Sequence, residues 1–472
     1  MALEIMITVG GSDYYLSDEG HAGASFGSTS GSQYYYPFVA VPPRLTWGPT
    51  GGGYISVQSG SLSLVNKPYD SNHPFSGTNY RNLLSDAGST SNVPTIAIKD
   101  STKYAIFDGT LVFNNLNSEV INFTIEGLDY DNYLASGTVT DSDSDTQVIP
   151  WPFGYVNTVP AFVYKGSQVW ANGASSTHPG FSKFGLVIFE GNTTSAIRYT
   201  SGATACSATE FDGQSATPAY SGGIVHVSGY GTKRSGNVNA AVAGDKTSTH
   251  YDLLEYVTLE IGLSNVDITR TSLSGNTLSI WQTNKIQVLD LFSKVCQATN
   301  HQFYIKRKQT SGAGQGAQFV VLVDRANNPA ATALTGSQII TSSYKIPAPF
   351  SSVVLRMNWI DLSGPETKTL DLVSNNLSYG KQIVYKNYYG TNKNTYGTQA
   401  NVDAIRDIEK KPIASVTLDG IYDTYQPGNR FTFNREQDQV KVDMLARSIS
   451  WDWASRQTTL SGDATLSIYE AS

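Results

Sequence analysis

The chain's two cysteines, Cys206 and Cys296, are the first residues to test for chemistry. Cys296 lies in the stretch IQVLDLFSKVCQATNHQFYIKR, residues 286–307, and His301 follows it five positions later. A cysteine beside a histidine can act as a thiolate nucleophile with its general base. This pair therefore decides whether the sequence favours an enzyme.

The residues around Cys296 follow the spacing of an amphipathic helix. Asn284 is a candidate N-cap, and the apolar stripe consists of Ile286, Leu289, Phe292, Val295 and Cys296. A thiol on the buried face of a helix, without a cationic neighbour, has a raised pKa and is a poor nucleophile. No third group is marked to orient His301. We predict a packed helix followed by a strand that begins at His301, and no catalytic residue.

Candidate metal ligands are sparse. Asp141, Asp143 and Asp145 alternate like the start of a calcium loop, but Thr146 and Pro152 replace the glycine and glutamate that such a loop needs. The histidines are scattered at positions 21, 73, 178, 226, 250 and 301. Two cysteines cannot complete a zinc or iron–sulfur set within one chain. We predict no metal site and no cofactor.

Other motifs that resemble functional sites also have simpler structural interpretations. The run GAGQG, residues 312–316, resembles a phosphate loop, yet a strand and not a helix follows it, so we expect a hairpin tip. Asp129 and Asp131 could serve glycoside hydrolysis, but such residues usually make turns in β proteins. No G-x-S-x-G elbow is present. Tyr34, Tyr35 and Tyr36 could stack on a sugar or pack against a partner, and an ordinary β edge explains them equally well.

The composition of the 472 residues favours a turn-rich β protein. Only 15% of the residues are charged, while 28 Tyr and 43 Gly are present, so hydroxyl groups must supply much of the polar surface. The net charge of −7 leaves no basic nucleic-acid footprint, and the run Lys306–Lys308 is too short to change this. Nucleic acid could slide past such a surface without sticking.

The sequence shows neither a secretory signal nor a membrane span. The start, MALEIMITVGGSDYY, lacks a basic region before its short apolar run. No apolar stretch approaches the roughly 18 residues that cross a bilayer.

The first part of the chain predicts two β regions. Residues 1–145 form the first, in which Ile121, Phe123 and Ile125 alternate with polar residues along the second arm of a hairpin over residues 104–128. The acidic stretch 140–147 marks its end. Residues 146–245 predict a β insertion domain that ends in a linker at 233–249.

The remainder predicts an α/β domain at 246–335 and a closing β domain at 336–472. The former has helices at 251–262 and around Cys296, then the strands HQFYIKR and FVVLVDR. The latter contains the strand PAPFSSVVLRMNWI, a helix at 401–412 stopped by Pro412, and a Pro427–Gly428 turn. The fold class is therefore mainly β with a small α/β segment, divided into several domains.

The order of these pieces resembles the hub (baseplate hub) proteins at the distal end of bacteriophage tails. GYISVQSGSLSLVNKPYD and IAIKDSTKYAIFDGTLVF resemble the N-terminal part of that family. The stretch from IWQTNKIQVLDLFSK to FVVLVDR is similar to its middle α/β segment. SYKIPAPFSSVVLRM, DTYQPGNRFTF and VKVDMLARSISWDWASRQTTLSG resemble its closing β domain.

The resemblance implies a structural virion protein without enzymatic activity, located at the phage tail tip or baseplate. Residues 1–145 and 336–472 would be tail-tube-like β domains, and a homotrimeric ring would contain six of them. The ring would contact a distal tail or tail tube protein on one face and a central fibre or spike protein on the other. DNA would pass through it without specific binding. Some members of the family carry an iron–sulfur cluster, but Cys206 and Cys296 stand in separate segments, so we predict none here.

Other functions remain open at this point. The chain could be a distal tail ring or tail tube protein, which a sixfold copy number would reveal. Its tyrosines and tryptophans would also suit a carbohydrate-binding receptor-recognition module. A glycan hydrolase is a further alternative, although no deep set of paired acids supports it.

Overall fold

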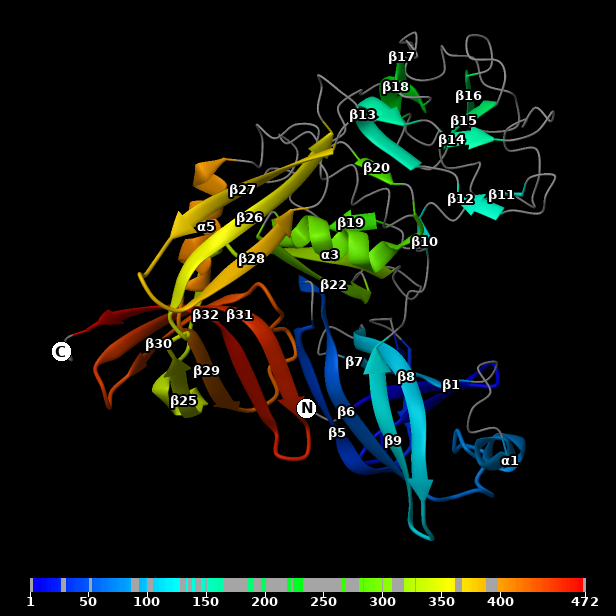
Figure 1. Ribbon diagram of the computed structural model, residues 1–472. Coiled ribbons are helices and arrows are strands. Elements are labelled where there is room, and N and C mark those ends of the chain that lie inside the picture. Colours follow the sequence, from blue (N-terminus) through cyan, green and yellow to red (C-terminus); the bar gives the residue numbers. More distant parts are fainter. Residues whose placement is uncertain are drawn as a thin grey trace. The chain divides into compact units, whose positions relative to one another are not determined.

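The computed structural model of the chain is mainly β, as the sequence predicts (Figure 1). It describes residues 3–26, 31–50, 53–85, 93–99, 105–127, 133–134, 138–140, 146–148, 151–160, 162–164, 185–189, 197–200, 219–221, 224–231, 265–267, 280–282, 284–298, 300–307, 318–326, 328–360, 367–387 and 398–469. The chain forms two compact units. Unit 1 contains Met1–Asp129, Asn300–Ala348 and Asp407–Ser472, and unit 2 contains Tyr130–Thr299 and Pro349–Arg406.

A 13-stranded sheet dominates unit 1, and its N-terminal half comes from the start of the chain. In spatial order this half consists of β2 (Ser12–Leu16), β1 (Ile5–Val9), β7 (Thr95–Lys99), β8 (Ala105–Leu116), β9 (Val120–Gly127), β6 (Ile55–Val65) and β5 (Val39–Pro49). All neighbouring pairs are antiparallel.

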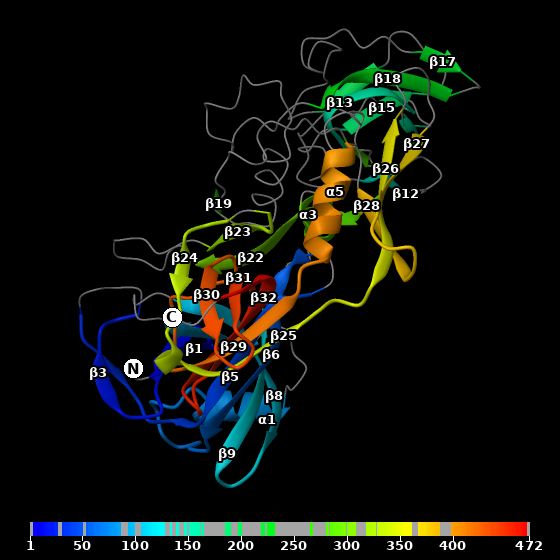
Figure 2. The ribbon, with the colours of Figure 1, turned by 90° about the vertical axis from the view of Figure 1, so that its left-hand side faces the viewer.

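The C-terminal half of the sheet continues directly from β5. Its strands are β31 (Val440–Asp452), β32 (Gln457–Ile468), β29 (Ile413–Asp419) and β25 (Ile339–Lys345), with β30 (Arg430–Arg435) and β24 (Ala331–Ala333) on a side branch (Figure 2). The first part of β31 pairs with β30, and its last part pairs with β5. The two ends of the chain therefore share one sheet.

Alternation along the strands puts one face of the sheet in a common apolar core. In β9, Ile121, Phe123 and Ile125 are buried, as predicted, while the residues between them are not. Because inward residues of both halves belong to a single cluster, the two halves form one packed body.

Two glycines are needed where the sheet turns or closes tightly. Gly428 has φ 94°, and the Asn429 N–H bonds the Gln426 carbonyl at 3.0 Å, which confirms the predicted Pro427–Gly428 turn as type II. Gly462 faces a bulge in β31, where a Cβ atom would lie 1.8 Å from the Leu445 carbonyl oxygen. No larger residue fits there without moving backbone.

Two smaller hairpins complete the description of unit 1. β22 (His301–Arg307) and β23 (Gln318–Asp324) pair over their full length, confirming the two strands expected after the Cys296 helix. β3 (His21–Gly23) pairs with β4 (Gln33–Tyr35). The helix α1 (Gly77–Ser85) lies between β6 and β7 in the chain.

Unit 2 is made of small sheets. The best described contains β26 (Phe350–Ile360) between β27 (Thr367–Asn375) and β28 (Lys381–Asn387). The helix α5 (Gln399–Glu409) packs Val402 and Ile405 against this sheet (Figure 2). Both the strand over 350–360 and the helix before Pro412 were predicted.

The other elements of unit 2 are short. They are β10 (Tyr133–Leu134), β11 (Thr138–Thr140), β12 (Thr146–Val148), β13 (Trp151–Pro160), β14 (Phe162–Tyr164), β15 (Gly185–Phe189), β16 (Ile197–Thr200), β17 (Ala219–Ser221), β18 (Ile224–Gly231), β19 (Asn265–Asp267), β20 (Ile280–Gln282), β21 (Ile286–Gln287) and α3 (Val288–Ala298).

Two details of the Cys296 helix differ from expectation. The helix α3 begins at Val288, because Ile286 and Gln287 pair with Tyr133–Leu134 as strand β21, so Asn284 is not its N-cap. Leu289 is only half-buried, while Val288 and Leu291 are fully buried. The expected helix at 251–262 and linker at 233–249 fall outside the described residues.

Candidate assembly surface

The seam between the two sheet halves is a short run of backbone pairing. Ile449–Asp452 of β31 pairs with Arg44–Trp47 of β5. Side chains reinforce this pairing: Thr46 Oγ1 donates to Ser450 Oγ at 3.0 Å, and Ser448 Oγ donates to the Trp47 carbonyl at 2.7 Å. The edge strand of the N-terminal half, β5, therefore pairs with the edge strand of the C-terminal half, β31, within a single molecule.

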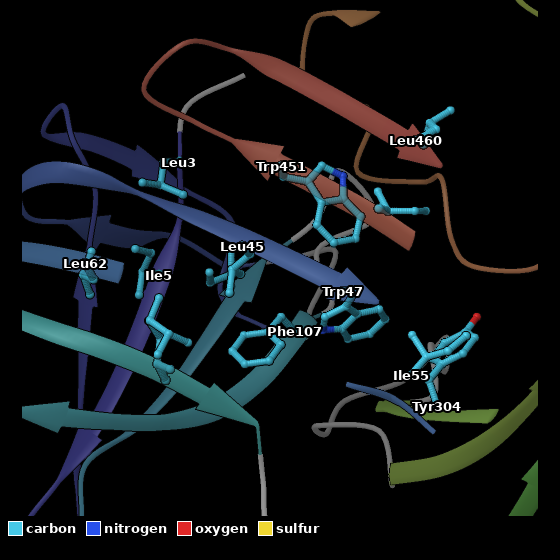
Figure 3. Close-up of a cluster of buried hydrophobic side chains, with 14 of the residues drawn as sticks. Leu3, Ile5, Leu45, Trp47, Ile55, Leu62, Phe107, Tyr304, Trp451 and Leu460 are labelled. Atoms are coloured by element: carbon cyan, nitrogen blue, oxygen red, sulfur yellow. The ribbon is translucent and has the colours of Figure 1, made fainter. Parts of the chain in front are cut away.

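Two tryptophans lie under the seam on its core face. The rings of Trp47 and Trp451 meet edge to face with centroids 6.1 Å apart (Figure 3). Trp451 Nε1 donates to the Tyr422 carbonyl at 3.1 Å, which satisfies the polar atom of a fully buried ring. Trp47 also contacts Phe107 and Tyr304. The seam is therefore part of the core of unit 1.

A buried ion network supports the C-terminal half. Asp463 is 4% exposed and accepts hydrogen bonds from Arg325 at 3.0 Å and Arg447 at 2.8 Å. Arg325 also bonds Glu409 at 3.1 Å. Burial alone would raise the pKa of Asp463, but the two guanidinium groups hold that pKa below its usual value. The carboxylate stays ionised although it is almost fully buried.

The sheet edge at β2 is closed from within the chain. The Ser17 N–H bonds the Tyr36 carbonyl at 2.8 Å, and the Tyr36 N–H bonds the Tyr15 carbonyl at 2.9 Å. These bonds occupy the outer side of the last part of β2. Of the tyrosine triplet, Tyr35 is fully buried, Tyr36 is partly buried and Tyr34 is 46% exposed. The triplet belongs to this edge, and it offers little surface for stacking on a sugar.

An ion pair fixes the β3–β4 hairpin beside the same edge. Lys99, whose side chain is 3% exposed, pairs with Glu4 and donates to the Ala24 carbonyl at 2.9 Å. His21 Nε2 lies 3.1 Å from Glu4 Oε1, and the His21 ring stacks on Tyr35. Burial lowers the pKa of His21, but the Glu19 carbonyl and Glu4 outweigh it, so the net shift is upward. This cluster holds the β3–β4 hairpin, which we call the cover, beside the edge at β2.

The edge at β25 is different. β25 pairs with β29 on one side, and the described residues place no strand on its other side. Its backbone groups there form a row that a further strand could pair with. Two exposed isoleucines lie along it: Ile340 on β25 and Ile346 just after it are 46% and 69% exposed.

The face of the sheet opposite the core is built of hydroxyl and amide side chains around the seam. We call it the hydroxyl face. Its members, all half-buried or exposed, are Ser415 and Thr417 (β29), Thr459 and Ser461 (β32), Ser448 and Ser450 (β31), Thr46 (β5), Ser61 and Ser63 (β6), and Asn122 and Thr124 (β9).

Several of these side chains bond one another across strands. Thr417 and Thr459 lie 3.1 Å apart, Ser63 Oγ donates to Asn122 Oδ1 at 2.6 Å, and Asn114 Nδ2 donates to Thr124 Oγ1 at 2.9 Å. The charged residues in the same rows are Arg44, Asp419, Asp452 and Glu126. The face is therefore polar and mildly acidic.

The predicted burial of Cys296 is confirmed. The thiol is fully buried in α3, and this burial raises its pKa well above the ordinary value. His301 begins β22, as expected, and its Nε2 atom lies 4.0 Å from Asp324 Oδ2. Neither observation supports a nucleophile.

The structure does not describe the remaining candidate residues. Asp129, Asp131, Asp141, Asp143, Asp145, Cys206 and the run 312–316 fall outside the described residues. Within the described part of the chain, no group of three His, Cys, Asp or Glu side chains is arranged to hold a metal ion. No helix in that part is long and apolar enough to cross a membrane.

His73 is a buried residue that motif reasoning passed over. It is 0% exposed and its ring packs against Phe38 and Phe75. Its Nδ1 accepts a hydrogen bond from the Phe75 N–H at 3.1 Å. Burial lowers the pKa of His73 from 6.5 to about 4. No sequence signal marks this, because only tertiary packing buries the ring.

No family model matches the chain, and no curated protein matches its sequence. Among solved structures, it is similar to the prophage MuSo2 43 kDa tail protein from Shewanella oneidensis, with 11% identity, a TM-score of 0.44 and 98% of each chain covered. A tail protein from Neisseria meningitidis MC58 is similar at 8% identity and a TM-score of 0.40, over 98% of this chain and 96% of that one.

A third similar structure is the prophage tail protein gp18 from Listeria monocytogenes EGD-e. It is 7% identical, with a TM-score of 0.34, over 97% of this chain and 94% of that one. The similar structures thus bear the names of phage tail proteins. At TM-scores below 0.5, these likenesses establish no shared activity, partner or assembly.

Proposed function

We propose that the chain is a structural protein of a bacteriophage tail, a hub whose copies close into a trimeric ring around a DNA exit channel. The resemblance of the sequence to tail hub proteins gives the direction of this proposal. The observation that carries it is the arrangement of the unit 1 sheet, which joins two halves within one molecule and then ends in an open edge at β25.

The two ends of the sheet determine how copies can join. The open edge at β25 and the covered edge at β2 make the two ends of the sheet unlike, so β25 of one copy would contact a different surface of the next copy. Copies that join through unlike surfaces make a ring when the rotation closes. A ring also covers the backbone row of β25, which would otherwise invite uncontrolled pairing.

The seam favours three copies over six. Each chain already contributes two sheet halves joined by β5 and β31. Three chains therefore bring six halves to a ring, which would match the sixfold tail tube that the resemblance implies. A distal tail ring or tube protein with six copies would not need two halves in each chain.

The other parts of the proposal follow from this placement. One face of the ring would contact a distal tail or tail tube protein, and the other a central fibre or spike protein. The hub would act by assembly, without a chemical step, at the tail tip or baseplate of the virion. The division into domains at 145, 245 and 335 belongs to the same proposal.

Native mass spectrometry of the full chain tests the ring. We expect a species of three times 51.0 kDa for the unaltered chain. Ile340→Lys combined with Ile346→Lys places two charges along the open edge, which should oppose strand pairing and leave the monomer. A trimer that survives both changes would remove β25 from the contact.

Ile468→Lys is the matched control. Ile468 is 84% exposed at the end of β32, so the same exchange there should leave the trimer intact. A chain that stays monomeric without any substitution, and that antibody labelling does not find on tails, would contradict the proposed function as a whole.

A further inference from the structure

The hydroxyl face differs from surfaces that bind other proteins. An interface core is depleted in charge and enriched in aromatic residues. The row Thr417–Thr459–Ser450–Thr46 instead presents four small polar side chains on four adjacent strands. Burial of such a face against another protein would gain little free energy, so the face suits a surface that remains in contact with solvent.

The face also differs from surfaces that hold nucleic acid. Binding of a single strand needs a cationic groove with aromatic rings, and binding of a duplex needs lysines and arginines that replace counterions. In the described rows around the seam the cation is Arg44, which stands opposite Asp452, while Asp419 and Glu126 add negative charge; Lys345 lies in the next row at the β25 end, and Arg325 and Arg447 are paired with Asp463. A polyanion near the seam would gain little from the release of counterions.

Hydrogen bonds within the face reduce its capacity for other ligands. Ser450 accepts from Thr46, Thr459 bonds Thr417, and Asn122 accepts from Ser63. Donors that already have partners offer less to a phosphate or a sugar. The face is therefore wettable, weakly acidic and largely self-satisfied.

The ends of the face are covered. Toward β1 and β2, Met6 and Ala97 form a small cluster with Phe26, beside the hairpin held by Lys99. Beyond Ser461 the same side of β32 carries Asp463, buried under Arg325 and Arg447. The open part is thus centred on the seam between β5 and β31.

We infer that the hydroxyl face lines the passage of the ring and lets a double-stranded polyanion move past without being held. This inference rests on the proposed function, and it assigns the wall of the channel to named residues. It follows that positive charge on this face, and not elsewhere on the sheet, slows the movement of DNA.

The test places lysines on the face in tail particles that carry the chain. Ser61→Lys with Ser415→Lys puts two cations on separate strands. Two added phosphate contacts make retention depend on salt with a slope of about −1.8, or about tenfold between roughly 200 mM and 50 mM salt. DNA release, followed with a fluorescent dye, should slow by about that factor at the lower salt.

Two controls isolate the face. Ser118→Lys with Ser455→Lys makes the same two exchanges at exposed positions in the turns β8–β9 and β31–β32, and should leave release unchanged. Ser61→Asp with Ser415→Asp keeps the face acidic and should also release DNA normally. If the double lysine variant is not incorporated, the exposed Ser61→Lys alone serves for the measurement.

Counting the chain in each particle separates the two claims. Face lysines that are incorporated at normal copy number, yet release DNA at the normal rate in low salt, would overturn the inference and leave the ring standing. Absence of the unaltered chain from particles would instead overturn the proposed function. Slowing by the turn lysines as well would show that charge anywhere suffices, which also contradicts the inference.

Discussion

The two halves of the unit 1 sheet treat their outer edges in opposite ways. In the N-terminal half, Tyr36 occupies the outer side of β2 and the Lys99–Glu4 pair holds a hairpin beside it. In the C-terminal half, the outer side of β25 carries no described strand and exposed isoleucines lie along it. One end of the sheet is covered within the molecule, and the described residues leave the other end uncovered.

The inner edges of the same halves show how an edge is completed. β5 and β31 pair through four residues each, over two packed tryptophans. A chain that can join two sheet halves within itself has the geometry to continue the sheet. The contrast between the covered edge and the open edge is what the proposed ring relies on for its direction.

The largest effect is expected from the seam. Trp451→Ala removes a fully buried ring that contacts Trp47, and should lower the free energy of unfolding by about 4 kcal/mol. Because both halves of the unit 1 sheet share one core, both should unfold in the same urea transition. Separate transitions for the two halves would show that they are independent. Trp453→Ala, at a partly buried position in the turn just after the same strand, should cost only about 1 kcal/mol.

The ion network of the C-terminal half comes next. Asp463→Asn leaves the guanidinium groups of Arg325 and Arg447 without their buried carboxylate, so it should cost about 3 kcal/mol of unfolding free energy. The comparison is Asp443→Asn, which breaks the more exposed pair with Arg430 and should cost about 1 kcal/mol or less. Equal losses for the two variants would contradict the importance of burial.

Acid should act on the N-terminal half through His73. Its pKa of about 4 in the folded protein lies below 6.5, so the unfolded chain binds a proton first as the pH falls. The contribution of His73 leaves the free energy of unfolding at its full value above about pH 6.5. This free energy is about 2 kcal/mol lower at about pH 5, and it levels off below about pH 4. Urea titrations at several pH values measure this.

His73→Phe should remove that component of the pH dependence. The variant loses the acceptor for the Phe75 N–H, so some stability is lost at neutral pH as well. An unchanged slope between pH 6.5 and 5 would assign the effect to another group. Residues 336–472 contain no histidine, so the C-terminal half has no such switch.

The smallest effect concerns the cover at β2. Lys99→Met keeps the length of the side chain but removes the charge that pairs with Glu4. We expect about tenfold faster hydrogen exchange at the Ser17 amide, which bonds Tyr36, from a local loss of about 1.5 kcal/mol. Amides of β29 should not change. Faster exchange in both halves would mean that the cover stabilises the whole sheet.

Local patterns predicted the strands and turns well. Alternation gave the buried face of β9, and the Pro427–Gly428 pair gave the type II turn. The apolar stripe around Cys296 predicted a buried helix, and the helix is present from Val288 onward. Ile286 and Gln287, which were expected in the helix, pair with β10 as a strand. These features depend on neighbours in sequence, which is why the sequence revealed them.

The candidate surface depends on pairing between distant residues. Thr46 and Ser450 pair across the seam although some four hundred positions separate them in the sequence. No local pattern in either segment predicts that the two segments pair. The hydroxyl face becomes visible only once the register of each strand pair is known. The composition indicated hydroxyl-rich surfaces, but it could not place them on one side of one sheet.

An image of the purified assembly tests the central claim most directly. We expect a ring of three chains with a central hole, in which β25 of each copy lies against the next copy and the hydroxyl face borders the hole. A single chain, or an assembly in which β25 stays uncovered and this polypeptide sits off the axis, would contradict it.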